Sequence, residues 1–300
     1  MTEIPNNELE FNKLMEEIDE ALKKQSVPIL GRQILAIREA CIRLGISLSI
    51  VPRSPAIPGK FYGNSLSSHI IDWYDKKYGD RLKVDLGLGN GAIILKGDAW
   101  KITFPRFYGS FKFIFDPNID RYKNFPEKSK GETYLIFNPL RCIDGLTSNF
   151  AITLEKQEIE NIKQFFILGI NAKKLLEDIK SKPLIPEAKT DMESSVSYIF
   201  SQPPHYGQSK WASLQFVEKL LKCYLELKRI KFKKTHDLLQ LATLAEQHGL
   251  PPLPRPFIHS VQCPPSVRYG EPRGTLEEAV EAHHSALKIC SYIAREIIAL

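Results

Sequence analysis

The hydrophobic residues in the last third of the chain recur at steps of three and four positions, which is the spacing of one face of an α-helix. This spacing predicts a helix of about twenty residues over 206–228. A shorter helix follows Thr235 as its candidate N-cap and ends at Gly249. Thr275 and Glu278 form a Thr-x-x-Glu capping box that begins a long final helix. Helices with wide apolar faces and short connections pack on one another, so we predict an up-and-down bundle.

Apolar and polar residues alternate between about residues 82 and 138, and a period of two is typical of half-buried β-strands. The predicted strands are residues 82–88, 92–95, 100–107, 110–116 and 134–138. Turns are predicted at Asn90-Gly91, the strongest short hairpin signal, and near Tyr108-Gly109. The predicted flanking helices are residues 1–24, 31–44, 67–78 and 154–180. The fold class predicted for this part is α+β, with an antiparallel sheet and flanking helices.

The length of the chain indicates two domains, because three hundred residues exceed the usual size of one. Hydrophobic residues make up 43% and charged residues 25%, which is ordinary for a globular chain with sizeable cores. Residues 182–190 carry two prolines and differ in composition from their surroundings. We therefore predict an α+β domain over 1–181, a linker over 182–190 and an all-α bundle over 191–300.

Charge and cysteine content narrow the class of protein only a little. The net charge of +6 is mildly basic, which is compatible with a nucleic-acid partner but does not require one. The five cysteines are scattered and lack C-x-x-C spacing, so we expect reduced thiols rather than disulfides or zinc ligands. No apolar run has the character of a signal peptide or a membrane span. We expect a cytoplasmic protein with no membrane association, no metal and no cofactor.

Four short motifs in residues 206–300 suggest a family. They are Lys-Trp-Ala at 210–212, Glu-Lys-Leu-Leu-Lys at 218–222, Thr-His-Asp-Leu-Leu at 235–239 and Val-Arg-Tyr-Gly at 267–270. With these motifs the last third of the chain resembles the HEPN family of small helical bundles. The resemblance implies a nucleotide- or RNA-linked module of bacterial toxin and defence systems. In the ribonuclease subset of that family an Arg and a His lie a few residues apart and act across a dimer interface.

Arg229 and His236 have the spacing of such a pair, with six residues between them. A ribonuclease of this kind needs a His to move a proton and an Arg to hold a phosphate. The resemblance then implies a metal-independent ribonuclease that acts as a homodimer through the bundle. The alternative is a purely structural role for both residues, in which His236 forms a hydrogen bond within the turn and Arg229 is exposed to solvent. The preferred hypothesis is a non-catalytic module that binds a nucleotide, RNA or a protein partner in defence or stress, and whether the chain is an enzyme stays open.

A second group of candidate binding residues lies on and near the predicted sheet. Cations interleaved with flat rings suit single-stranded nucleic acid or a nucleotide. The alternative is a sheet that simply has one solvated face. The candidate binding residues are Lys96, Trp100, Lys101, Arg106, Tyr108 and Lys112, together with Arg268 from the bundle.

Overall fold

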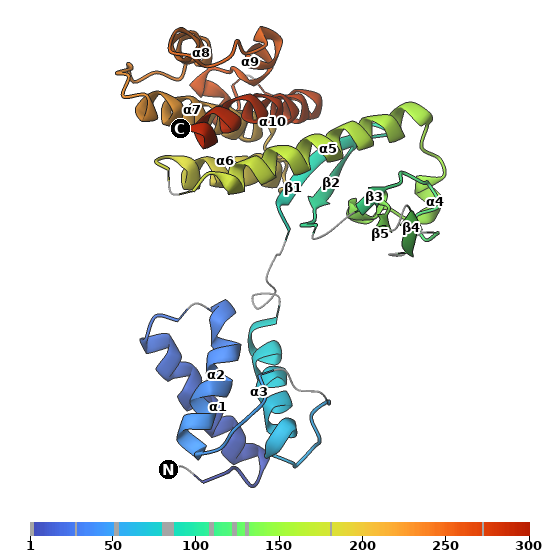
Figure 1. Cartoon of the computed structure of the whole chain (residues 1–300), viewed down its shortest axis with the longest axis vertical. Coiled ribbons are helices and arrows are strands. Elements are labelled where there is room, and N and C mark those ends of the chain that lie inside the picture. The colour runs from blue at the N-terminus through green and yellow to red at the C-terminus, as the bar shows by residue number, and fades with distance from the viewer. Residues whose placement is uncertain are drawn as a thin grey trace. The chain divides into compact units, whose positions relative to one another are not determined.

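The structure is a computed structural model that describes residues 3–27, 29–50, 54–79, 87–107, 111–121, 125–129, 132–180, 182–271 and 273–300. The chain divides into two compact units, an N-terminal unit of Met1–Asp85 and a C-terminal unit of Leu86–Leu300 (Figure 1). Acidic and basic residues are equal in number in the N-terminal unit, so the excess positive charge of the chain belongs to the C-terminal unit. Among the described residues, no helix has the length and apolar character of a membrane span.

The N-terminal unit is built from three helices, close to the three that the spacing predicts. They are α1 (Glu8–Lys24), α2 (Ile29–Leu44) and α3 (Gly63–Tyr78). Their apolar faces form one core that includes Phe11, Met15, Ile18, Ile37, Ile70 and Tyr74. The buried carboxylate of Asp19 accepts a hydrogen bond of 2.6 Å from Tyr78 and lies 3.1 Å from Lys77 Nζ. These contacts join α1 to α3.

The C-terminal unit begins with an antiparallel hairpin of β1 (Gly89–Leu95) and β2 (Asp98–Phe104). Its turn is Lys96-Gly97, whose positive φ angles of 51° and 88° are typical of a type I′ turn. The predicted turn at Asn90-Gly91 is wrong, because both residues lie inside β1. A Cβ at Gly91 would lie 2.8 Å from the Phe104 and Phe165 rings, so a close ring contact requires this glycine.

A second, mixed sheet follows the hairpin. Its strands are β3 (Phe111–Phe113), β4 (Phe125–Ser129) and β5 (Glu132–Phe137), in the order β3-β5-β4. β1 pairs with β2 and β4 with β5 in antiparallel fashion, whereas β3 runs parallel to β5. The predicted antiparallel sheet is therefore confirmed only in part, and the α+β class holds. The short helices η2 (Pro139–Cys142) and α4 (Ser148–Ala151) come next. The predicted turn residue Tyr108 lies outside the described residues.

Long helices complete the C-terminal unit, and Figure 1 shows α5 lying along the hairpin. They are α5 (Lys156–Asp178), α6 (Ile185–Ile199), α7 (Tyr206–Leu227), α8 (Leu238–Gln247), α9 (Arg255–Val261), η3 (Pro265–Tyr269) and α10 (Leu276–Ala299). Ile93 and Phe104 of the hairpin share one core with Leu214 of α7 and Leu287 of α10. This shared core keeps the hairpin and the bundle in one unit. The division of the chain therefore differs from the predicted linker at 182–190, where α6 already begins.

The predicted N-cap can be compared with the observed one at the start of α10 and of α8. Thr275 caps α10, because its side chain accepts a hydrogen bond of 3.2 Å from the Glu278 N–H, as predicted. The cap of α8 is Asp237, which accepts from the Gln240 N–H at 3.0 Å. Thr235 instead accepts from the Asp237 N–H, so its predicted role as N-cap is corrected by two positions.

A buried ion pair connects β1 to α5 and α6. Lys173 of α5 is 1% exposed, and its Nζ lies 2.6 Å from Glu193 Oε1 on α6. The other carboxylate oxygen of Glu193 accepts from the Asn90 N–H at 3.3 Å. At Gly89, with φ at +109°, a Cβ would lie 2.2 Å from Glu193 Oε1. The start of β1 is therefore fixed by a pair of charges and a glycine that makes room for them.

Candidate functional site

The first candidate site is a surface centred on Trp211 of α7. The Arg268 guanidinium lies 4.7 Å from the centre of the Trp211 ring and 5.3 Å from that of Tyr269. The His236 ring approaches Trp211 edge-on, with the ring centres 5.2 Å apart. Tyr269 is 78% exposed. One cation and three rings thus gather where α7, η3 and the start of α8 meet. We call Trp211, His236, Arg268, Tyr269 and the connector 228–234 the aromatic–basic surface.

His236 is oriented by a carboxylate in this surface. Its Nδ1 lies 2.8 Å from Oε2 of Glu218, whose side chain is only 5% exposed. Glu218 also accepts from Lys222 Nζ at 2.6 Å and from Gln215 Nε2 at 3.2 Å. The Gln262 amide donates to the His236 carbonyl at 3.2 Å. Because Nδ1 is engaged, Nε2 is the ring nitrogen that remains for a ligand.

The connector between α7 and α8 contributes the charge of the surface. Its sequence from 228 to 234 is Lys-Arg-Ile-Lys-Phe-Lys-Lys, and every basic side chain in it is exposed. None of these five cations has an acidic partner within the described part of the chain. The Glu218 carboxylate is paired with Lys222 Nζ and contacts His236 Nδ1 instead. The connector is therefore a strip of exposed positive charge that leads from the end of α7 to His236 of the Trp211 cluster.

The predicted catalytic residues Arg229 and His236 lie beside different parts of α7 within one chain. His236 contacts Glu218 near the middle of α7, whereas Arg229 lies beyond the end of that helix at Leu227. Glu218 and Leu227 are nine helical steps of 1.5 Å apart, which is about 13 Å along the axis of α7. Arg268, in contrast, shares the Trp211 ring with His236. The sequence pattern offered Arg268 no nearby His, because the two positions meet only in the folded chain.

The predicted cations of the hairpin face are engaged with acids. Lys96 pairs with Glu155 and Glu158 at 3.3 and 2.9 Å, and Lys101 pairs with Asp144 at 2.7 Å. These contacts favour the structural interpretation of this face, because paired charges attract phosphate only weakly.

The other predicted binding residues on and near the sheet have different environments. Arg106 Nη1 donates to Glu177 at 2.6 Å, and the Trp100 ring packs on Phe150 with centres 4.7 Å apart. Lys112 lies on β3 with its side chain exposed. Tyr108 lies outside the described residues. Of the predicted binding residues, Arg268 is the one that lies in the aromatic–basic surface.

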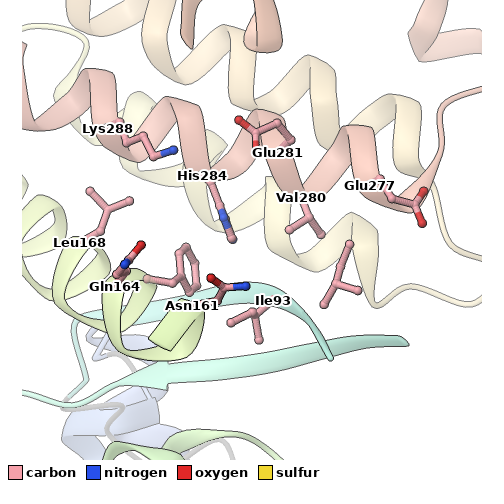
Figure 2. Close-up of a pocket in the computed structure, with 11 residues that line it drawn as sticks. Ile93, Asn161, Gln164, Leu168, Glu277, Val280, Glu281, His284 and Lys288 are labelled. Atoms are coloured by element: carbon pink, nitrogen blue, oxygen red, sulfur yellow. The ribbon is translucent and has the colours of Figure 1, made fainter. Parts of the chain in front are cut away.

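The second candidate site is a groove of about 560 Å³ between β1, α5 and α10 (Figure 2). Its apolar part is formed by Ile93, Ile94, Phe165, Leu168 and Val280, and its polar part by Asn161, Gln164, Glu277, Glu281, His284 and Lys288. Figure 2 shows His284 pointing from α10 into the groove. Its Nε2 donates to the Ala92 carbonyl at 2.8 Å, and its ring stacks on Phe165 with centres 3.9 Å apart. No motif in the sequence predicts this groove.

The two histidines of α10 make acid stability a testable property. Burial lowers the pKa of His284 to about 4 and that of His283 well below its ordinary value. An unfolded chain protonates these groups near pH 6.5, so it binds more protons than the folded chain below that pH. We expect the melting temperature to fall by roughly 5 °C or more between pH 6.5 and 4, and His284→Gln to reduce this fall. Scanning calorimetry measures the melting temperature at each pH, with the exposed-residue variant His259→Gln as control. The same dependence of melting temperature on pH in both variants would contradict this prediction.

Comparison of the chain with known proteins gave no match. No protein-family model, no curated protein and no solved structure matches it. Within the described ranges, no group of three or more His, Cys, Asp or Glu side chains has the arrangement of a metal site. The function is therefore inferred from the chemistry of the two candidate sites.

Proposed function

We propose that the C-terminal unit contains a HEPN-like module that binds single-stranded RNA, without cleaving it, through the aromatic–basic surface. The observation that carries this proposal is the connector 228–234, whose five basic side chains are exposed and have no acidic partner among the described residues. Unpaired cations attract the phosphate backbone, and they do so along a strip rather than at a point.

The neighbouring rings support single-stranded RNA as the partner. Bases of a single strand are unstacked, and they stack on exposed aromatic side chains regardless of sequence. Tyr269 is exposed for such stacking, and the Arg268 guanidinium beside it offers a second flat, charged surface. A mononucleotide would use only part of the strip, because it carries its phosphates at one end. An acidic protein would meet the charge but would not need the rings.

Replacing Tyr269 by Ala is expected to weaken RNA binding by roughly tenfold, because one stacked base contributes about 1–3 kcal/mol. Fluorescence anisotropy with a labelled, unstructured RNA measures this loss. The matched control is Tyr292→Ala, which removes a partly exposed tyrosine from α10. Equal RNA affinity of the wild-type chain and the Tyr269→Ala variant would contradict the proposed stacking of a base on Tyr269.

The second candidate function is metal-independent RNA cleavage. It is favoured by one observation, the Glu218 carboxylate on Nδ1 of His236, because a His held in this way is oriented to move protons through Nε2. The assay is RNA cleavage in EDTA by the wild-type chain and by the variants His236→Ala, Arg229→Ala and Arg268→Ala. Cleavage lost with His236 would establish an enzyme, and the arginine variant that loses it would identify the phosphate ligand. Intact RNA at all protein concentrations eliminates this candidate for the RNA used.

A further inference from the structure

The outer edge of β1 leaves one main-chain position open inside the groove between α5 and α10. Alternate residues of a strand direct their main-chain groups to the same side. The Asn90 N–H bonds Glu193 and the Ala92 carbonyl accepts from His284, so this side of β1 faces away from β2. Ile94 is the next residue on that side and lines the groove. Its N–H and C=O have no hydrogen bond to any other described residue.

We propose that this groove binds a planar, uncharged aromatic compound whose edge carries a hydrogen-bond donor next to an acceptor. The donor bonds the Ile94 carbonyl and the acceptor bonds the Ile94 N–H, so both open main-chain groups gain a partner. The ring packs on the apolar side chains Ile93, Leu168 and Val280. A groove of about 560 Å³ with apolar walls and a few polar groups has the size and character of a small-molecule site.

The charges around the groove select an uncharged ligand. Glu277 and Glu281 contribute two carboxylates, of which Glu281 also accepts from Ser285 at 2.9 Å. Lys288 contributes one ammonium group, which lies 4.8 Å from the centre of the Phe257 ring. His284 is neutral at pH 7, because burial lowers its pKa to about 4 despite the hydrogen bond to the Ala92 carbonyl. The excess of negative charge repels phosphate, whereas the carboxylates accept hydrogen bonds from sugar hydroxyl groups.

An added peptide strand does not fit the same edge. His284 occupies the Ala92 carbonyl on one side of Ile94, and Glu158 accepts from the Lys96 N–H at 3.2 Å on the other. Strand addition needs a row of open main-chain groups, and among the described residues on this side of β1 only Ile94 has both its N–H and its C=O open. Two sources share the required chemistry, a nucleobase with or without its sugar and an aromatic carboxamide.

The test is ligand-observed NMR titration of the full chain with adenosine, uridine, benzamide and adenosine monophosphate. We expect at least one uncharged probe to bind, and the monophosphate to bind at least tenfold more weakly than adenosine. Preference for a nucleoside or for benzamide identifies the source of the ring. If no uncharged probe binds at millimolar concentration, or if the monophosphate binds best, the proposal is overturned.

Two pairs of variants locate the binding. Ile94→Pro removes the N–H that faces away from β2, which an edge strand tolerates, and Ile94→Ala keeps it. Ile94→Pro is expected to weaken binding about tenfold relative to Ile94→Ala, the effect of one lost hydrogen bond to a ligand group. Gln164→Trp fills the groove, whereas Lys163→Trp places the same ring on an exposed position outside it.

These variants also decide between outcomes. Loss of binding in Gln164→Trp but not in Lys163→Trp supports the groove even if Ile94→Pro fails to fold. Unchanged ligand binding by the Gln164→Trp variant overturns the proposed groove site. This inference is independent of the RNA-binding proposal, because the groove and the aromatic–basic surface share no residue.

Discussion

Replacing Glu193 by Gln is expected to lower the free energy of unfolding by about 3 kcal/mol, because it removes the carboxylate that pairs with the buried Lys173 ammonium group. Lys173 is 1% exposed and its Nζ lies 2.6 Å from Glu193 Oε1. The loss falls at the lower end of the range for buried pairs, because the Glu193 side chain is 39% exposed and water reaches it. Urea denaturation of the full chain measures the change.

The double variant Lys173→Met with Glu193→Gln serves as the control. It removes the buried charge together with its partner, so much of the lost stability should return. Destabilisation by Glu193→Gln of less than about 0.5 kcal/mol, the range of ordinary surface changes, would contradict the assigned role of this pair.

Gly207→Ala is expected to destabilise the C-terminal unit by about 2 kcal/mol, the cost of overpacking at a tight contact. A Cβ at Gly207 would lie 2.3 Å from the main-chain oxygen of Val267, and main-chain atoms yield less readily than side chains. The required shift moves η3, which carries Arg268 and Tyr269. We therefore expect RNA affinity to fall together with stability.

Gly31→Ala in α2 is the matched control, because its Cβ would make an ordinary contact of 3.6 Å with Val27. Alanine is favoured over glycine inside a helix, so this change should be neutral or stabilising by up to about 1 kcal/mol. Thermal unfolding and RNA anisotropy measure both variants. Wild-type stability in Gly207→Ala would contradict the close approach of α7 and η3.

The helices were predictable because their spacing repeats over several turns. The strands were less so, because short strands depend on partners far along the chain. Asn90-Gly91 shows this clearly: the dipeptide predicts a turn, but Asn90 bonds Glu193 and Thr103 while Gly91 makes room for two rings. Lys96-Gly97 is the actual turn.

The site was predictable in part. His236 and Arg268 were both singled out, but their common contact with Trp211 arises from packing between segments distant in sequence. Lys96 and Lys101 looked free until the fold brought Glu158 and Asp144 beside them. The groove could not be predicted, because His284 and Ala92 are 192 positions apart.

The salt dependence of RNA binding tests the proposed surface most directly. Each cation that contacts a single strand contributes about 0.7 to the slope of log K against log salt. Changing Lys231, Lys233 and Lys234 to Gln is therefore expected to reduce the slope by about 2 and to weaken binding at low salt. Changing the exposed residues Lys156, Lys174 and Lys180 to Gln removes the same charge elsewhere and should leave the slope unchanged. Equal slopes in both triple variants, or no RNA binding by the wild-type chain, would contradict the proposed surface.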